Sequence, residues 1–377
     1  MAEGVAKAGS SGSVARTLGA ATRSASGRCL DAQGQIQLVV LEPGGLLRIA
    51  GWIGSSWGPA TALTVQCGDR KLPIATIELG LGSPGVAQFI PQLPNAANVG
   101  FRIRVGDVAS LDQVRGQVLR VTPFFGDEVG LDLLGVIEPV IEPPSADELD
   151  LVSKNLSVGF EFLGYFQEFF GLATDAKVLE VGCGVGRMPF ALAHHLGPSG
   201  SYDGFEIVQR FIDVAKQRFR TLPNFRFQHA NVSNEEFNPD GDILAADLVF
   251  PYPDGAFDLV FLTSVFTHMR PPEVQHYIDE IRRVLAPGGR CLATAFLMDA
   301  EANAQIANGH ASMPLHPSGM GFYWGDPARP EMAVGFDEPE FFQWWTERGF
   351  TVDRVLRGSW CGTPQFSTFQ DVVMLSR

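Results

Sequence analysis

The sequence predicts an α/β fold in its larger, C-terminal part and a small all-β domain before it. From residue 177 onward, short apolar runs alternate with segments of helical periodicity, the pattern of a parallel, doubly wound sheet. Between residues 36 and 123, β-branched runs alternate with Gly, Pro, Asn and Asp, which indicates a small all-β sandwich. A stiff, proline-interrupted connector at 137–144 separates the two patterns.

Composition indicates a globular protein with an acidic balance of charge. The chain has 377 residues, of which 45% are hydrophobic and 19% charged, and its formal net charge is −14. We expect no nucleic-acid partner, because this charge repels a phosphate backbone. No apolar run is long enough to span a bilayer, and the five cysteines lack a Cys-x-x-Cys pair. We therefore expect a cytoplasmic protein without a membrane span, disulfide framework or zinc site; a homo-oligomer is left open.

The chain divides into three expected segments. Residues 1–30 are rich in Ala, Ser and Gly and are interpreted as a disordered tail, with an organellar transit peptide as the less favoured alternative. Residues 31–135 form the expected β-sandwich domain, in which Trp52 and Trp57 are interpreted as core residues rather than platforms for sugar rings. Residues 145–377 form the expected α/β domain, which begins at a sequence of capping-box form.

The order of elements in the α/β domain follows from its alternating pattern. The expected strands are 178–181, 201–206, 225–229, 257–262 and 290–297, and the expected helices run to 196 and over 208–219, 272–285 and 338–348. The turn PGGR (287–290) leads into the fifth strand. Strands 352–355 and 371–375 are expected to close the sheet as an antiparallel hairpin.

The stretch KVLEVGCGVGRMPF (177–190) is the strongest local signal for a ligand site. An apolar strand leads into a turn with three glycines, where the backbone can adopt positive φ, and then into a helix whose first N–H groups are unpaired. A dinucleotide fold requires G-x-G-x-x-G, whereas Arg187 occupies the third glycine position here. Glu180 would repel a pyrophosphate but could pair with the amino group of an amino-acid-like ligand.

Polar residues also follow the next apolar runs of the predicted sheet. Glu206 ends the second strand, Asn231 and Val232 follow the third, and Ser264 follows the fourth. Ligands of open α/β sheets bind at the carboxyl ends of the strands, so these residues are expected at one edge. Two of these residues also have a purely structural interpretation. Glu206 can be an acid at a helix N-terminus, and Asn231 can be part of a turn or helix cap.

These residues resemble the motifs of class I S-adenosylmethionine-dependent methyltransferases. The segment EVGCGVGR (180–187) is similar to the first motif, and the resemblance extends from about residue 145 to residue 377. It implies a Rossmann-like methyltransferase sheet with S-adenosyl-L-methionine as cofactor. Glu206 would hold the ribose hydroxyls, and Asn231, where the family usually has Asp, would contact the adenine. The cofactor-binding residues that the resemblance implies are Glu180, Gly182, Cys183, Gly184, Gly186, Glu206, Asn231, Val232 and Ser264.

Methyl transfer to a hydroxyl requires alignment of the reactants and a base. His268, just after the fourth strand, is the best placed of the seven histidines for catalysis; the alternative is a histidine that only shapes the pocket. The segment 300–335, rich in Gly, Pro, Ala and Asn, is expected to form a lid over the acceptor. No metal is expected, because Asp299, Glu301 and Asp371 show no recognisable ligand spacing.

The N-terminal segment suggests the acceptor. Its stretches GWIGSSWG, LGSPGVAQFIPQLP and GFRIRV resemble small β-sandwich modules that accompany glycosyltransferases and sugar-modifying methyltransferases. We therefore expect an O-methyltransferase that acts on a sugar or glycan hydroxyl, in polysaccharide modification. The alternatives are a methyltransferase for a small phenol- or quinone-type metabolite and a non-catalytic carbohydrate-binding protein with a vestigial cofactor pocket. The intact glycines and the acids at 180 and 206 argue against the vestigial pocket.

Overall fold

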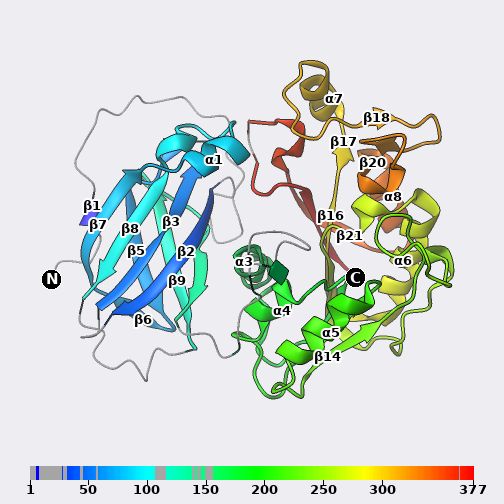
Figure 1. The fold of residues 1–377 in the computed structure, drawn as a ribbon, viewed down its shortest axis with the longest axis horizontal. Coiled ribbons are helices and arrows are strands. Elements are labelled where there is room, and N and C mark those ends of the chain that lie inside the picture. The colour runs from blue at the N-terminus through cyan, green and yellow to red at the C-terminus, as the bar shows by residue number, and fades with distance from the viewer. Residues whose placement is uncertain are drawn as a thin grey trace. The chain divides into compact units, whose positions relative to one another are not determined.

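The computed structural model of the chain describes residues 6–7, 28, 32–42, 46–56, 58–106, 116–137, 141, 145, 147–148, 156–364 and 366–377. It contains two compact units (Figure 1). The N-terminal unit comprises Met1–Ser145, Ser153–Leu172 and Phe190–His195, and the C-terminal unit comprises Ala146–Val152, Ala173–Pro189 and Leu196–Arg377. Helix α3, which the sequence analysis places in the α/β domain, thus belongs to the N-terminal unit by its contacts.

The N-terminal unit contains two antiparallel sheets (Figure 1). One has the order β1-β5-β9-β10, with β11 paired to β9 and β6 to β5; the other has the order β2-β3-β8-β7, with β4 paired to β3. The elements are β1 (Ala6–Lys7), β2 (Gln33–Glu42), β3 (Leu46–Ser55), β4 (Gly58–Pro59), β5 (Ala62–Cys67), β6 (Arg70–Leu72), β7 (Ile74–Leu81), α1 (Pro84–Phe89), η1 (Ala96–Asn98), β8 (Gly100–Val105), β9 (Val118–Phe125), β10 (Glu128–Val129), β11 (Leu133–Val136) and α3 (Val158–Phe170).

The two sheets share one hydrophobic core. Ile49 of β3, Ile103 of β8 and Val121 of β9 are fully buried members of the same cluster. Successive side chains of a strand point to opposite faces, so the buried Ile49, Gly51 and Ile53 place Trp52 on the other side of the sheet. Trp52 is partly exposed and lies outside this core, so its interpretation as a core residue is wrong. Trp57 lies outside the described residues.

The predicted tail, 1–30, lies outside the described residues except for three positions. Two of these, Ala6–Lys7, form strand β1, which pairs with Leu63 and Ala62 of β5. This short strand differs from the disorder predicted for the segment, because β5 supplies backbone partners that the sequence of the tail does not reveal.

The C-terminal unit is built on a seven-stranded sheet of order β14-β13-β12-β15-β16-β22-β21. Strands β12 to β16 pair in parallel, and β22 pairs antiparallel with both β16 and β21. The first elements are β12 (Lys177–Val181), α4 (Arg187–Leu192), β13 (Ser201–Glu206), α5 (Gln209–Arg218), β14 (Phe225–His229), η3 (Ala245–Asp247), β15 (Phe257–Leu262), η4 (Phe266–His268), α6 (Pro271–Val284) and β16 (Leu285–Ala295). The remaining elements are β17 (Leu297–Met298), α7 (Ala300–Ala307), β18 (His316–Pro317), β19 (Tyr323–Trp324), η5 (Pro330–Met332), β20 (Val334–Asp337), α8 (Glu338–Glu347), β21 (Thr351–Leu356), η6 (Ser359–Cys361) and β22 (Asp371–Ser376).

Two element boundaries differ from the sequence-based expectations by four or five residues. Helix α4 ends at Leu192 instead of residue 196, because the chain turns there and the N–H of His194 donates to the carbonyl of Ala191. Strand β16 begins at Leu285, where it already pairs with Phe257, and the register then shifts before Arg290 pairs with Leu259. The turn PGGR is therefore an irregularity inside the strand.

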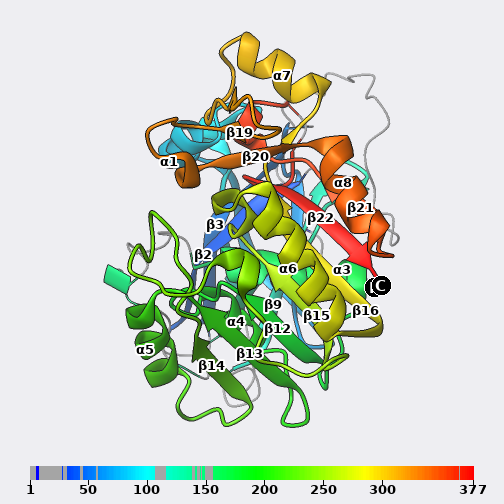
Figure 2. The ribbon, with the colours of Figure 1, turned by 90° about the vertical axis from the view of Figure 1, so that its right-hand side faces the viewer.

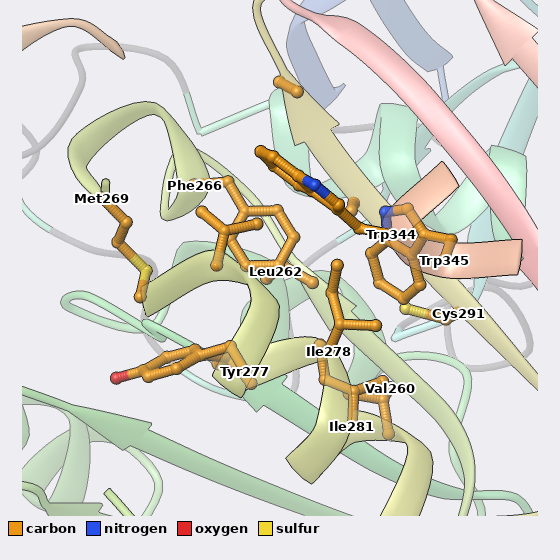
Figure 3. Packing of buried hydrophobic residues seen from close by; sticks show 14 of the residues in the cluster. Val260, Leu262, Phe266, Met269, Tyr277, Ile278, Ile281, Cys291, Trp344 and Trp345 are labelled. Atoms are coloured by element: carbon orange, nitrogen blue, oxygen red, sulfur yellow. The ribbon is translucent and has the colours of Figure 1, made fainter. Parts of the chain in front are cut away.

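Helix α6 packs against the sheet through an apolar face (Figure 2). Its residues Val274, Ile278 and Ile281 belong to the same buried cluster as the residues of β15 and β16. Figure 3 shows Phe266 of η4 among these side chains, and Phe266 is fully buried. This burial fixes η4 at the end of β15.

The segment expected to be a lid has more regular structure than predicted. It carries α7 and contributes β18 and β19 to a four-stranded sheet of order β17-β20-β19-β18. Asp371, at the start of β22, connects β17 to the loop between β21 and β22. Its carboxylate accepts from the N–H of Leu297 in β17 (2.9 Å). It also accepts from the N–H of Gly358 (2.8 Å) and the indole N–H of Trp360 (2.8 Å) in that loop. Buried apolar residues, including the fully buried Trp360, give this region its own core.

Candidate cofactor site and candidate base

The glycine-rich turn follows β12 at the carboxyl edge of the sheet. Gly182, Gly184 and Gly186 have φ angles of 76°, 53° and 91°, which L side chains rarely adopt. A Cβ at Gly182 would lie 2.5 Å from Val265 Cγ2, so this turn and the end of β15 are in close contact. The N–H groups of Gly182 and Cys183 both donate to the carbonyl of Phe205, which ties the turn to β13. The buried Cys183 thiol has its pKa raised by burial, so it is an uncharged packing group.

Glu206 ends β13 beside this turn. Its Oε2 accepts from the N–H of Gly184 (2.9 Å), and its Oε1 accepts from the N–H groups of Ile207 (2.8 Å) and Val208 (3.1 Å). Burial raises the pKa of Glu206, and the three backbone N–H groups oppose that effect. Each carboxylate oxygen can accept about two hydrogen bonds, so the two backbone donors occupy Oε1, and Oε2 retains one acceptor position for a ligand hydroxyl. The backbone contacts fix the orientation in which Glu206 presents its oxygens.

Glu180 is more enclosed than the sequence suggested. It lies within β12 and is 1% exposed, and its Oε2 accepts a hydrogen bond of 2.6 Å from the hydroxyl of Tyr202. Burial raises the pKa of Glu180 to about 8, although the Tyr202 hydrogen bond and the charge of Arg187 act in the opposite direction. The carboxyl group is therefore mostly protonated at neutral pH, and it would ionise only if a cation approached it.

Gly204 makes the contact between Tyr202 and Glu180 possible. Gly204 pairs directly with Glu180 across the parallel strands. A Cβ at Gly204 would lie 2.6 Å from the hydroxyl oxygen of Tyr202 and 2.9 Å from Cβ of Cys183. The absent side chain thus leaves the space that the Tyr202 hydroxyl occupies.

The loop after β14 differs from the expected arrangement. Nδ2 of Asn231 donates to Oδ1 of Asp242 (2.9 Å), and Oδ1 of Asn231 accepts from Nδ2 of Asn238 (3.1 Å). The N–H of Val232, one of the residues expected to bind the cofactor, donates to the carbonyl of Ala230 at 2.7 Å. Asn231 thus keeps only one lone pair on its oxygen for a ligand, and the Val232 N–H is engaged within the turn.

Ser264 follows β15 with a positive φ of 58°, which is uncommon for a residue other than glycine. Its N–H donates to Oγ1 of Thr294 (2.8 Å), and its hydroxyl donates to Oε1 of Gln370 (3.1 Å). Thr294 donates to the same Gln370 oxygen at 2.6 Å. These hydrogen bonds join the ends of β15 and β16 to the start of β22, and they hold the exposed Ser264 in a strained conformation.

His268 ends η4, four residues beyond Ser264. Its Nδ1 lies 2.8 Å from the carbonyl oxygen of Glu331, so Nδ1 carries the proton and donates to that oxygen. In the neutral ring, Nε2 is then the acceptor. Burial lowers the pKa of His268, and the contact with Glu331 and the charge of Glu236 oppose this effect. The residue is thus a neutral imidazole of defined tautomer at neutral pH.

Apolar side chains lie next to this imidazole. The ring of Phe237 meets His268 edge to face with a centroid distance of 4.9 Å, and Phe237 is 44% exposed. Met332, which is 38% exposed, follows Glu331 in η5. The loop containing Phe237 is held to η5, because the N–H of Glu235 donates to the carboxylate of Glu331 at 2.7 Å. An apolar, solvent-accessible surface therefore lies beside the candidate base.

The sequence analysis missed Tyr202 and Asp242. Tyr202, Gly204 and Glu206 alternate along β13 and point to one face of the sheet, a period-2 signal that could have identified Tyr202. No comparable signal existed for Asp242, since its proximity to Asn231 depends on how the loop after β14 closes.

The described residues contain no group of three or more His, Cys, Asp or Glu side chains arranged to hold a metal ion. Cys67, Cys183, Cys291 and Cys361 are buried free thiols. Within the described part of the chain, no helix combines the length and apolar character needed to cross a membrane.

Comparison with known proteins gives a family match for part of the chain. Residues 179–291 match the family model of the methyltransferase domain. The demethylmenaquinone methyltransferase of Geobacillus sp. (strain WCH70) is 31% identical over 123 residues, which cover 32% of this chain and 45% of that protein. The corresponding enzyme of Staphylococcus aureus (strain JH9) is 28% identical over 127 residues, covering 33% and 46%. The chain thus spans about half the length of the curated relatives that it matches.

Among solved structures, a S-adenosylmethionine-dependent methyltransferase from Methanosarcina mazei is similar, with 20% identity, a TM-score of 0.39 and coverage of 55% of this chain and 94% of that chain. The magnesium protoporphyrin IX methyltransferase from Synechocystis PCC 6803, with bound S-adenosylhomocysteine, has 16% identity and a TM-score of 0.39, with coverage of 59% and 83%.

The segment matched by the family model contains the site described above. Residues 179–291 match a methyltransferase domain, and S-adenosylmethionine is its cofactor. The donor set is compatible with that molecule: Glu206 offers an oriented carboxylate oxygen, Oε2, to a hydroxyl group, and Glu180 is a carboxyl group that a cation would ionise.

Proposed function

We propose that the protein transfers a methyl group to a hydroxyl-bearing acceptor, with His268 as the base that removes the hydroxyl proton. The hydrogen bond from Nδ1 of His268 to the carbonyl of Glu331 is the observation that carries this proposal. It orients the ring and leaves Nε2 as the proton acceptor, and burial keeps the imidazole neutral.

S-Adenosylmethionine, when bound, supplies an electrophilic methyl group on a sulfonium sulfur. The protein's task is then to align an acceptor oxygen with that methyl group and to take up one proton. When the acceptor oxygen takes that methyl group, Nε2 of His268 would accept the proton that the hydroxyl loses. Glu206, oriented by three backbone N–H groups, is proposed to hold the ribose hydroxyls.

A phenol- or quinol-type ring is the acceptor class that we propose first. The exposed parts of Phe237 and Met332 provide an apolar surface beside His268, where an aromatic ring can pack. The names of the curated relatives, which refer to demethylmenaquinone, support the same class. Only a third of this chain takes part in those matches, so the support concerns the methyltransferase domain.

A sugar or glycan hydroxyl is the second candidate. One observation favours it: Trp52 lies on the outer face of an N-terminal sheet, where an aromatic ring can carry a saccharide, instead of in the core. Under this proposal, residues 31–135 act as a separate β-sandwich domain that binds the acceptor polymer, and the enzyme belongs to the polysaccharide-modifying type.

The test is a transfer assay with purified protein and methyl-labelled S-adenosylmethionine. The acceptor panel contains a catechol, a naphthoquinol, a neutral oligosaccharide and a uronate oligosaccharide. We expect label in the ring compounds and its loss in His268→Ala. The matched control is His310→Ala, because His310 is an exposed histidine whose ring lies within hydrogen-bond distance of the Gln305 side chain. Label in the saccharides alone would replace the first acceptor class by the second.

Binding of S-adenosylmethionine without transfer to any member of the panel would contradict the proposed acceptor classes and would favour a vestigial pocket. Undiminished transfer by His268→Ala would contradict the role of His268 while leaving the activity itself intact. The two failures are distinguishable because the first affects the wild-type protein and the second only the variant.

A further inference from the structure

The outer face of the sheet β2-β3-β8-β7 combines an aromatic ring with several arginines. Along β3 and β8, buried core residues alternate with Arg48, Ala50 and Trp52 and with Arg102 and Arg104, so these side chains share the face that points away from the core. Both Arg102 and Arg104 are exposed. The strands are neighbours in the sheet, so the side chains form one continuous surface.

Trp52 is held in place on this face. Its indole N–H donates to Oε1 of Gln35 on β2 at 3.0 Å, which fixes the orientation of the ring. On the other side, Trp52 pairs with Gly100 of β8, which has no side chain to cover it. A Cβ at Gly100 would lie 2.8 Å from the carbonyl oxygen of Leu81, so the backbone of β7 excludes a larger residue there. Gly100 is buried, and no side chain at this position lies between Trp52 and β7.

The arginines are placed where like charges are unfavourable. Arg48 and Arg104 stand directly opposite each other on β3 and β8, and in a sheet this arrangement of like charges is destabilising. Arg102 pairs with Glu78 at 3.2 Å, but both side chains are about half exposed, at 48% and 50%, so that ion pair contributes little. No ion pair of Arg104 is present among the described residues. Arg48 is only partly exposed and has an interaction partner within the fold, so Arg102 and Arg104 are the exposed cations of this face.

This concentration of positive charge contrasts with the rest of the segment. Residues 29–145 contain seven Lys and Arg residues against eleven Asp and Glu residues. Three of the seven cations, Arg48, Arg102 and Arg104, lie on this face. They belong to two neighbouring cross-strand pairs of β3 and β8, which are about 7 Å apart because each strand residue rises about 3.3 Å. The sheet therefore presents a local positive surface on a segment that is acidic as a whole.

We propose that this face, formed by Gln35, Arg48, Ala50, Trp52, Arg102 and Arg104, binds an acidic saccharide polymer of the uronic-acid class. A sugar ring packs its C–H face on Trp52, and its carboxylate pairs with the guanidinium group of Arg102 or Arg104, whose planar fork matches a carboxylate. The small side chain of Ala50 lies between the Trp52 and Arg48 positions and leaves room for a chain that runs along the sheet.

The geometry of the face indicates a polymer instead of a small molecule. Sites for small molecules are concave and bury most of the ligand, whereas an open sheet face does not. An extended ligand gains contacts at several rows of the sheet, each of them weak by itself. Charge complementarity selects an anionic polymer, and the net charge of −14 on the whole chain disfavours a polyphosphate with its higher charge density.

The test is electrophoresis of the full-length protein in native gels that contain a soluble polymer. The polymers are polygalacturonate, alginate and hyaluronate, with dextran as the neutral control and single-stranded oligo(dT) as the nucleic-acid control. We expect at least one uronate polymer to retard the wild-type protein and added salt to weaken the effect. Arg102→Ala and Arg104→Ala should each weaken binding by about tenfold or more, the effect of losing a charge-assisted hydrogen bond.

Lys71→Ala is the matched control, because Lys71 is an exposed cation on β6 of the other sheet and should leave binding unchanged. Trp52→Phe keeps a smaller ring and should weaken binding less than Trp52→Ala, with melting temperatures measured to confirm that both variants fold. The proposal is overturned if none of the three uronate polymers retards the protein, or if Lys71→Ala weakens binding as much as Arg104→Ala. Equal retardation by dextran, or tighter binding of oligo(dT), would also overturn it. Because the readout is binding, the result does not depend on the proposed methyl transfer.

Discussion

The hydroxyl of Tyr202 donates a 2.6 Å hydrogen bond to the buried carboxyl group of Glu180, across neighbouring strands of the sheet. The contact joins β13 to the strand that leads into the glycine-rich turn. It also determines which oxygen of Glu180 remains for a ligand, because Oε2 is the atom that Tyr202 contacts.

Glu180→Gln should raise stability and weaken cofactor binding. The pKa of Glu180 is raised to about 8, so the folded protein keeps a proton that the unfolded chain releases near its ordinary value of 4.5. This difference lowers the free energy of unfolding progressively from about pH 4.5 to about pH 8. The neutral amide removes that loss, and we expect an increase in melting temperature on the order of 2–4 °C at pH 8 and none at pH 4. A gain of equal size at both pH values would contradict the buried protonated acid.

The same group predicts the pH dependence of cofactor affinity. If the amino group of S-adenosylmethionine pairs with Glu180, binding ionises the acid, so affinity should increase with pH up to about 8 and then level off. Calorimetry in buffers of different ionisation enthalpy would detect the released proton. Glu180→Gln should abolish the proton release. Tyr202→Phe is the control that retains the acid and removes only its hydrogen-bond donor.

Glu206→Ala should weaken cofactor affinity by roughly 1.5–3 kcal/mol, the range for hydrogen bonds to a charged group. It also leaves three backbone N–H groups without their acceptor, so the melting temperature of the cofactor-free protein should fall. Glu206→Gln keeps one acceptor oxygen, so its cofactor affinity and its melting temperature should lie between those of the wild type and of Glu206→Ala. Unchanged affinity in Glu206→Ala would show that the ribose is held elsewhere.

Asn231→Asp should weaken cofactor binding, although Asp is the usual residue at this position in the methyltransferase family that the sequence resembles. The substitution places a second carboxylate about 2.9 Å from Asp242, where the wild-type amide donates a hydrogen bond. We expect lower cofactor affinity at pH 8 than at pH 5, because protonation of one carboxyl group relieves the repulsion. The combination with Asp242→Asn should restore affinity at pH 8. If the single variant binds normally at both pH values, this loop is free to rearrange.

His268→Ala should lower kcat by ~100-fold to ~10,000-fold with little change in cofactor affinity, if proton removal limits the reaction. Burial lowers the pKa of His268, so the wild-type rate should fall only when the pH drops below the ordinary histidine value of 6.5. Neutral imidazole alone can accept the proton, and the variant should lose this acidic limb of the pH profile. A variant that retained the limb would assign it to another group.

Much of the C-terminal sheet was predictable from local patterns. The apolar runs at 178–181 and 257–262 correspond to β12 and β15 within one residue. A strand buried on both faces requires a continuous apolar run, and such a run is visible in the sequence without knowledge of its neighbours. The glycines of the turn were predictable for the same reason, because their positive φ angles restrict the residue type at each position.

The segment 300–335 was less predictable. Its Gly, Pro and Asn content indicated an irregular lid, whereas the structure contains α7 and a small sheet. That sheet forms because β20 pairs both with β17, which precedes the segment, and with β19, which lies within it. Pairing between distant strands of two to four residues leaves no periodicity that a sequence could reveal.

The sequence by itself determined the residue types at the strand ends and the conformations that the glycines permit, because these depend on each residue and its immediate neighbours. Only the tertiary structure decided what those residues contact. It enclosed Glu180 beneath Tyr202, bound Asn231 to Asp242, and assigned the proton of His268 to Nδ1 through the carbonyl of Glu331. It also placed Trp52 on the outer face of its sheet, since the direction of a strand side chain depends on which of its two faces the fold buries.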